Sequence, residues 1–150
     1  VFGGYYQNPQ ATAEVSAYGW HHTGDIGYRD DQGFIYIVDR KKDMIVTGGF
    51  NVFSAEVENV IAGHPAVEDC AVIGVPDDKW GEAVKAVIQL KPQACAEAEE
   101  IIVLVKSRLG SVHAPKTVDF VDSLPRSPNG KVLKREIREQ YWQGVERRVG

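Results

Sequence analysis

The stretch Leu124-Pro125-Arg126-Ser127-Pro128-Asn129-Gly130-Lys131 decides how the C-terminal part of this chain is interpreted. Its two prolines fix φ at about −65° and keep the residues before them out of helical conformations. Asn129-Gly130 then offers a site for a positive φ, so we expect a sharp turn just before Lys131. The run from Val132 to Arg138 is typical of the start of a basic helix. The stretch therefore predicts one lysine held at a tight bend.

A fixed ammonium at a loop tip can meet phosphate oxygens, because lysine is a compact charge on a long stem. The bend is close in sequence to four more cations: Arg126, Lys134, Arg135 and Arg138. The alternative is an exposed basic loop between two elements, and the composition of the loop alone favours that interpretation. The basic run could also suggest nucleic acid, but Glu136 and Glu139 interrupt it, so a solvated helix face is the simpler interpretation.

The bulk composition is that of an ordinary globular protein, with 43% apolar and 25% charged residues among 150. The formal net charge of −4 argues against a general nucleic-acid surface. Cys70 and Cys95 match no metal or redox spacing, which favours reduced thiols in a cytoplasmic protein. No apolar run is long enough to span a bilayer, and no signal peptide is recognisable. The opening on Val1 without an initiator methionine suggests a piece of a longer protein.

The first part of the chain predicts little regular structure. We expect a short helix from Pro9 to about Ser16 and a β-branched, aromatic strand at Phe34–Val38. A turn at Asp30–Gly33 places that strand in a hairpin. The run Asp39-Arg40-Lys41-Lys42-Asp43 carries more charge than a buried strand could hold, so we expect exposed chain and a boundary or hinge there.

From residue 41 onward, the pattern of elements is β-α-β-β-α-β-loop-α, which predicts a small α+β domain with a short sheet flanked by helices. The expected elements are a strand at Met44–Val46, a glycine turn at Thr47–Asn51, a helix at Ala55–Ile61 capped by Ser54, strands at Val67–Val75 and Ala83–Leu90 joined by a loop, a helix at Ala96–Leu109 ended by Gly110, a strand at Thr117–Val121 and a helix from about Lys134 to Val145.

Four stretches occur in the order found in adenylate-forming enzymes, and nearly the whole chain resembles that superfamily of acyl-CoA synthetases, carrier-protein adenylation domains and firefly-type luciferases. The stretches are Thr23-Gly24-Asp25, Asp39 to Ile45, Gly48 to Val52 with Glu56-Val57-Glu58, and Pro125 to Lys131. The resemblance implies that residues 1–41 end a large N-terminal AMP-binding domain and that residues 42–150 form its small mobile C-terminal domain. The phosphate loop, the acyl pocket and the Mg²⁺-binding glutamate of the family do not occur in this stretch.

The resemblance also implies roles for single residues. Asp25 would accept hydrogen bonds from the ribose hydroxyls of ATP, and Arg40 would contact the ribose and phosphate region. Asn51 would support adenylate binding. Lys131 would be catalytic, bridging the carboxylate substrate and the α-phosphate as charge builds on phosphorus. Without the other motifs, a turn-capping Asp25 and a surface ion pair of Arg40 are the simpler interpretations.

Lys42 falls at the hinge of the family, where exposed backbone changes φ/ψ as the small domain rotates between half-reactions. After rotation, the Gly48-Gly49 turn would replace Lys131 and leave room for the pantetheine arm of CoA. We predict no metal ligands in this chain, since His21-His22 lack a third ligand. Trp80 is interpreted as simple packing.

The implied activity is that of an ATP- and CoA-dependent carboxylic acid ligase, with Mg²⁺ held mainly by the N-terminal domain. The motifs look most like those of medium- to long-chain fatty-acyl-CoA ligases. Two alternatives stay open: an adenylation module that loads a carrier protein, and a stand-alone binding domain without catalysis. The expected partners are ATP, a carboxylic acid, CoA and the N-terminal domain of the same protein.

Overall fold

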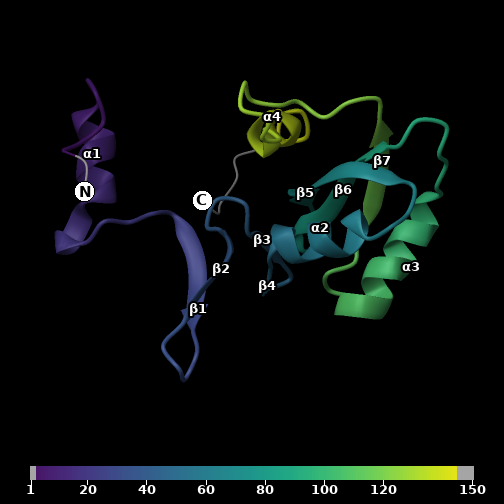
Figure 1. The fold of residues 1–150 in the computed structure, drawn as a ribbon, viewed down its shortest axis with the longest axis horizontal. Coiled ribbons are helices and arrows are strands. Elements are labelled where there is room, and N and C mark those ends of the chain that lie inside the picture. The colour runs from purple at the N-terminus through teal and green to yellow at the C-terminus, as the bar shows by residue number, and fades with distance from the viewer. Residues whose placement is uncertain (1–2, 145–150) are drawn as a thin grey trace. The chain divides into compact units, whose positions relative to one another are not determined.

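The computed structural model describes residues 3–144 and divides the chain into two compact units, with the boundary between Lys41 and Lys42. The first unit contains α1 (Pro9–Val15), a 3₁₀ turn (Ala17–Gly19), β1 (Asp25–Arg29) and β2 (Ile35–Arg40). The second unit contains β3 (Ile45–Thr47), β4 (Phe50–Val52), α2 (Ser54–Ala62), β5 (Val67–Asp77), β6 (Gly81–Leu90), α3 (Ala98–Leu109), β7 (Thr117–Val121) and α4 (Lys134–Glu139) (Figure 1).

The predicted hairpin in the first unit is confirmed, because β1 and β2 pair antiparallel across the turn that follows Asp30. The Asp30 carboxylate organises this turn. It accepts hydrogen bonds from the backbone N–H groups of Gln32 and Phe34 at 3.0 and 2.9 Å and from the Tyr36 hydroxyl at 3.0 Å. Desolvation acts to raise the pKa of Asp30, but these hydrogen bonds together lower it.

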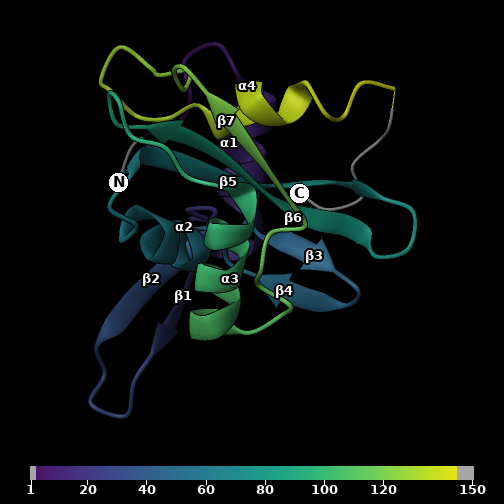
Figure 2. The ribbon, with the colours of Figure 1, turned by 90° about the vertical axis from the view of Figure 1, so that its right-hand side faces the viewer.

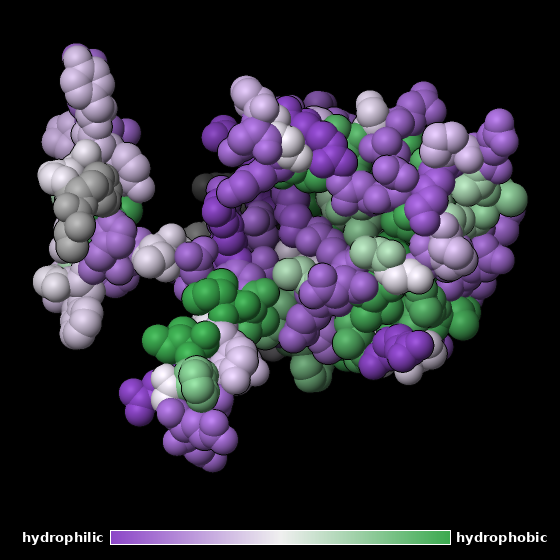
Figure 3. Space-filling view, in the orientation of Figure 1, coloured by the Kyte–Doolittle hydropathy of each residue, from purple (hydrophilic) through white to green (hydrophobic). Residues whose placement is uncertain are grey.

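The hairpin exposes large apolar side chains. Phe34, Ile35 and Ile37 are 62%, 72% and 66% exposed, and Figure 3 shows green apolar surface on the hairpin above its purple, hydrophilic tip. Two strands alone are marginally stable in water, and exposed apolar surface of this kind marks a region that packs against other protein. The hairpin therefore needs further surface to cover it.

The second unit is built on a mixed sheet in which β4, β3, β6 and β5 are consecutive neighbours and β7 also pairs with β6. Strands β5 and β6 are antiparallel along their whole length, whereas β7 runs parallel to β6. Helices α2 and α3 cover one face of the sheet, and α4 covers the other (Figures 1 and 2). Cover on both faces explains why β5 and β6 are nearly continuous apolar runs. The predicted α+β class is confirmed.

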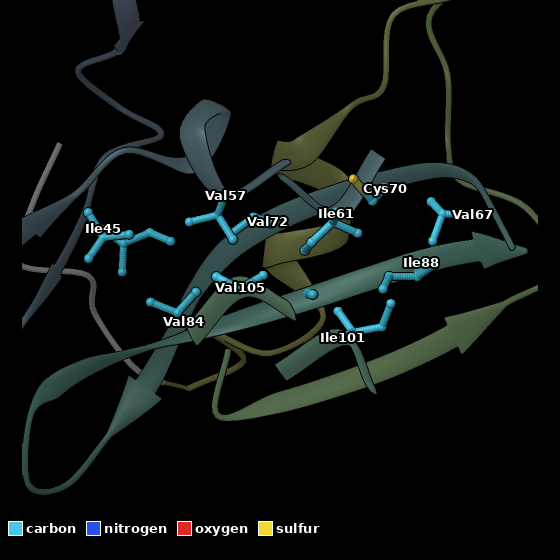
Figure 4. Close-up of a cluster of buried hydrophobic side chains, with 12 residues drawn as sticks. Ile45, Val57, Ile61, Val67, Cys70, Val72, Val84, Ile88, Ile101 and Val105 are labelled. Carbon is cyan, nitrogen blue, oxygen red and sulfur yellow. The ribbon is translucent and has the colours of Figure 1, made fainter. Parts of the chain in front are cut away.

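The larger core lies between the sheet and helices α2 and α3. Its apolar side chains point toward one another (Figure 4) and come from six elements, β3, β4, α2, β5, β6 and α3. They include Ile45, Val52, Val57, Ile61, Val72, Val84, Ile88, Ile101 and Val105. A smaller core beneath α4 contains Ala71, Ile73, Val87, Leu124 and Ile137. Leu124 thus fixes the start of the proline-rich stretch, and Ile137 fixes the helix that follows it.

Several predicted boundaries were wrong. The glycine turn occupies only two residues and is followed by a further strand, β4, which makes a hairpin with β3. The loop before β6 is also short, because β5 continues to Asp77 and β6 starts at Gly81. Helix α4 ends at Glu139, whereas the sequence predicted a helix to Val145, which lies outside the described residues.

The helix starts differ as well. Ser54 is the first residue of α2 rather than its cap, and its hydroxyl accepts a hydrogen bond from the Lys134 ammonium at 2.9 Å. Helix α3 begins at Ala98, two residues later than predicted, because Glu97 and Glu100 form a capping box there. The predicted end of α3 at Gly110 is confirmed by the φ of +87° of that glycine.

Candidate functional site

Lys131 lies at the end of a tight turn that closes on itself. Arg126 and Val132 form an antiparallel bridge, and the backbone N–H of Ser127 donates to the Lys131 carbonyl at 2.8 Å. The N–H of Gly130 donates to the Ser127 carbonyl at 2.8 Å, and Gly130 has a φ of +83°. The predicted bend with a positive φ is therefore confirmed, and it leaves Lys131 exposed.

The cations around this turn are already paired. Each has a carboxylate partner: Arg126 with Asp69, Lys134 with Glu58 at 2.7 Å, Arg135 with Glu139 at 2.7 Å, and Arg138 with Asp43 at 2.7 Å. Within residues 3–144, by contrast, the Lys131 ammonium has neither a hydrogen bond nor an ion pair. Lys131 is therefore available to an incoming anion.

Lys134 anchors the far side of the turn. Its ammonium donates to Glu58 Oε2 at 2.8 Å, and Glu58 Oε1 in turn accepts the backbone N–H of Val72 at 2.7 Å. The Lys134 side chain is only 18% exposed. The interpretation of this run as a solvated helix face is wrong for Lys134 and for Arg138, whose side chain is 12% exposed.

Asp25 and Arg40, fifteen positions apart, are brought together in the first unit. They are register partners at the end of the β1–β2 hairpin, and Arg40 Nε lies 3.8 Å from Asp25 Oδ1. Their side chains are 35% and 58% exposed. Asp25 also lines an open depression of about 570 Å³, together with His22 and Lys41. The hairpin thus places a carboxylate acceptor and a guanidinium side by side, both of them partly exposed.

Gly48 and Gly49 form the two-residue turn of the β3–β4 hairpin, with φ of +55° and +84°. Two positive φ values in succession are typical of a type I′ turn, which matches the strand twist. The Gly48 N–H donates to the Trp80 carbonyl at 2.9 Å, and a Cβ on Gly48 would lie 2.6 Å from the Trp80 ring. Asn51 follows on β4, exposed and opposite Val46. The structure therefore places the two glycines and Asn51 on one hairpin, separate from the Lys131 turn.

A cleft of about 210 Å³ opens beside the glycine turn. It is lined by Thr47, Gly48, Phe50, Trp80, Ser111, Val112 and Lys116. Phe50 is 60% exposed and Trp80 is 42% exposed, so both aromatic rings are partly open to a ligand. Trp80 was interpreted from the sequence as simple packing, and its ring does lie against Gly48. Its place in a cleft was missed, because nothing in the sequence connects it to Phe50.

Lys42 is exposed in the turn between β2 and β3, at the boundary of the two units. The residues on either side of the lysine pair are less open than predicted. Asp39 is 8% exposed, and the Asp43 side chain is 13% exposed. The prediction of an exposed charge run thus holds for Arg40, Lys41 and Lys42 but is wrong for the two aspartates.

Metal ligands do not gather in the part of the chain that the structure describes, where no three His, Cys, Asp or Glu side chains form a group able to hold an ion. No described helix has the length and apolarity needed to cross a membrane. Both cysteines are free thiols. Burial, with a smaller contribution from Glu58, raises the pKa of Cys70 to about 12, so this thiol is inert packing.

A family model described as AMP-binding enzyme C-terminal domain matches residues 56–131, just over half of the 150 residues. The chain belongs to this family. The resemblance to adenylate-forming enzymes is thereby confirmed, and the match ends at Lys131 itself.

Proteins with similar sequences and structures support this family assignment. The medium/long-chain-fatty-acid–CoA ligase FadD8 of Mycobacterium tuberculosis is 52% identical over 99% of this chain and 27% of its own length. The fatty acid–[acyl-carrier-protein] ligase ScoC of Streptomyces coeruleorubidus is 42% identical over 97% of this chain and 28% of its own length. The crystal structure of ATP-bound MatB from Rhodopseudomonas palustris has a TM-score of 0.85 and 39% identity, covering 94% of this chain and 28% of MatB. The chain thus spans less than a third of these relatives.

Proposed function

We propose that this chain is the C-terminal part of an ATP-dependent carboxylic acid–CoA ligase that acts through an acyl-adenylate. Residues 1–41 would end the N-terminal AMP-binding domain, and residues 42–150 would form the mobile C-terminal domain. The observation that carries the proposal is the exposed ammonium of Lys131, which has no partner within residues 3–144 although the cations around it are paired. The apolar β1–β2 hairpin supports the first assignment, since it needs a larger domain to cover it.

In the first half-reaction, a carboxylate oxygen of the acid attacks the α-phosphorus of ATP. The bond from that phosphorus to the bridging oxygen breaks, and pyrophosphate leaves with the electron pair. Lys131 stabilises the negative charge on the phosphoryl oxygens and holds the carboxylate in line. Asp25 accepts hydrogen bonds from the ribose hydroxyls, Arg40 contacts the ribose and phosphate region, and Asn51 supports the adenylate. The described residues offer no ligand set for the Mg²⁺ that accompanies ATP, and we place its ligands in the N-terminal domain.

In the second half-reaction, the CoA thiolate attacks the acyl carbon, and AMP leaves with the electrons of the acyl–oxygen bond. Rotation about Lys42 exchanges Lys131 for the Gly48-Gly49 turn. A turn without side chains leaves room for the pantetheine arm. The neighbouring cleft offers aromatic faces from Phe50 and Trp80 and a cation from Lys116, which suits an arm that ends in phosphates.

The substrate class that we favour is a medium- or long-chain fatty acid, because a ligase of that class is 52% identical. A second candidate is transfer to a carrier protein instead of CoA. The similarity to a fatty acid–[acyl-carrier-protein] ligase favours this acceptor. The two candidates share the first half-reaction and differ only in the thiol.

The test uses the full-length enzyme and measures the two half-reactions separately. Lys131→Ala should lower pyrophosphate release by about 10²- to 10³-fold, the usual cost of losing one charge-stabilising group. Thioester formation from supplied acyl-AMP should be unchanged. The matched control is Lys106→Ala, which removes an exposed lysine on α3 and should alter neither step. An equal loss in both half-reactions would contradict the assignment of Lys131 to adenylation.

A further inference from the structure

A part-buried ion pair joins segments near the two ends of the second unit. Asp43 Oδ1 and Arg138 Nη2 lie 2.7 Å apart, and the two side chains are 13% and 12% exposed. Burying two charges costs desolvation energy, so such a pair is weak evidence of added stability and is better explained by specificity of position. The two residues are 95 positions apart in the sequence, so the pair closes a long loop of the second unit.

The positions of Asp43 and Arg138 in the chain suggest which parts of the second unit the ion pair connects. Asp43 directly follows Lys42, the proposed hinge. Arg138 lies in α4, whose first residue, Lys134, is fixed to Glu58 and comes three positions after Lys131. One connection from the hinge to the Lys131 turn therefore passes from Asp43 to Arg138 and back along α4, beside the Arg126–Asp69 and Lys134–Glu58 pairs that tie the turn to β5 and α2.

We propose that Asp43 and Arg138 are positioning residues for adenylation, which transmit the orientation of the hinge to the Lys131 turn. This inference rests on the proposed function, and in particular on Lys131 and Lys42. A charged contact at a hinge would let the second unit rotate as one body, so that Lys131 arrives at the α-phosphate with its geometry fixed. Misplacement of a catalytic group by about 1 Å can cost about a hundredfold in rate.

The Gly48-Gly49 turn is held by contacts other than the Asp43–Arg138 pair. The proposal therefore predicts that loss of the pair affects only one of the two half-reactions. Strand β3 leaves the hinge directly and is fixed by Ile45, which is fully buried, and by Glu82, whose Oε2 accepts the Val46 N–H at 3.2 Å. The Gly48-Gly49 turn thus keeps its position without the ion pair. Loss of the pair should therefore impair the half-reaction that uses Lys131 and leave the half-reaction that uses the glycine turn intact.

The experiment compares Asp43→Asn and Arg138→Gln in the full-length enzyme. We expect the kcat of adenylation to fall about tenfold to a hundredfold. The KM for ATP should stay within about twofold, because Asp25 and Arg40 supply the ribose contacts. The rate of thioester formation from supplied acyl-AMP should also stay within about twofold. The doubly substituted enzyme should be no slower than the slower single variant, since both changes remove one interaction. Arg135→Gln, which removes an exposed pair on the same helix, is the matched control and should have no effect.

Each other result overturns the proposal. Equal losses in both half-reactions, a raised KM for ATP, or an unchanged adenylation rate in a folded variant would leave the pair a purely structural contact. Folding is checked by urea unfolding, and if Arg138→Gln does not fold, Arg138→Lys, which keeps the charge, takes its place with an expected intermediate rate. Lys131→Ala is assayed in parallel. If Lys131→Ala keeps its adenylation rate, the assignment of Lys131 fails as well. If Lys131→Ala loses adenylation selectively while the Asp43 and Arg138 variants keep it, only the positioning role is overturned.

Discussion

Gly48 and Gly49 stand side by side in one turn but differ in what surrounds them. A Cβ on Gly48 would lie 2.6 Å from the Trp80 ring, whereas nothing lies within 4 Å of a Cβ on Gly49. Both have positive φ, so alanine at either position costs about 1 kcal/mol of backbone strain. Only alanine at Gly48 also has to displace an aromatic ring that lines the cleft.

We therefore expect Gly48→Ala to lower thioester formation from acyl-AMP by more than tenfold (roughly 1.4 kcal/mol or more) while adenylation is kept. Gly49→Ala is the matched control, with the same strain and no clash, and it should reduce the same rate by no more than a few-fold, roughly. The measurement is single-turnover thioester formation with CoA. Equal effects of the two substitutions would show that backbone strain, rather than the Trp80 contact, determines the rate.

At the scale of elements, one polar network joins β6 and β7 to Tyr141, which lies two residues after the end of α4. The Lys85 ammonium donates to Asp119 Oδ1 at 2.8 Å and lies 4.8 Å from the Tyr141 ring centroid, and the Tyr141 hydroxyl donates to Asp119 Oδ2 at 2.6 Å. Desolvation acts to raise the pKa of Asp119, but the hydrogen bonds from Lys85 and Tyr141 lower it. Burial, followed by the hydrogen bond to Asp119, raises the pKa of Tyr141 to about 12.

This network predicts a dependence of stability on alkaline pH. An unfolded tyrosine ionises at about pH 10, whereas folded Tyr141 keeps its proton to about pH 12. The folded state thus binds more protons in that interval. The stability contributed by Tyr141 is fully present below about pH 10 and is lost as the pH rises through about 12.

The comparison is between the native sequence and Tyr141→Phe, followed by urea unfolding from neutral pH into the alkaline range. The variant should be less stable by about 1 kcal/mol at neutral pH, because it loses one hydrogen bond. The difference between the two proteins should shrink toward the alkaline end. Asp119→Asn should lower the pKa of Tyr141, as read from tyrosinate absorbance. A difference that stays constant with pH would contradict the assignment of the raised pKa to Tyr141.

Secondary-structure elements could be predicted from the sequence where neighbouring residues alone determine them. The positive φ of Gly130, the stop at Gly110 and the paired apolar runs of β5 and β6 all follow from neighbouring residues. Strand β4 was missed because three residues are too few to display an alternating pattern. A charge in a sequence does not reveal its partner, so the contacts of Lys134 and Arg138 with residues 76 and 95 positions away could not be foreseen.

The same limit applies to the candidate site. The Lys131 bend and the Asp25–Arg40 hairpin could be expected because each is local or joined by one turn. The cleft beside Gly48 could not, since it combines three segments that only the fold brings together. Asp43 was assigned to an exposed run because a sequence window averages over neighbours, whereas burial is decided residue by residue.

At the scale of the whole molecule, the boundary between the two units falls between Lys41 and Lys42. The backbone there forms a turn, with Lys41 and Lys42 both exposed. Residues on either side are held within their own units: Lys41 N–H donates to the Gly24 carbonyl at 2.8 Å, and Asp43 pairs with Arg138. Lys41 and Asp43 are thus each fixed within one unit, and we place the proposed hinge at the Lys41–Lys42 link between them.

Lys42→Pro should therefore separate the two half-reactions in the opposite sense to Lys131→Ala. Proline locks φ at about −65° and restricts the residue before it, so the link can no longer change conformation. Adenylation should be kept within about a few-fold, and thioester formation from supplied acyl-AMP should fall by about a hundredfold or more, because the glycine turn cannot arrive. Lys42→Ala removes the same side chain without locking φ, so it is the control that separates the loss of the side chain from the locked backbone. Stopped-flow measurement of AMP release on addition of CoA distinguishes the variants, and rapid release in Lys42→Pro would place the hinge at another residue.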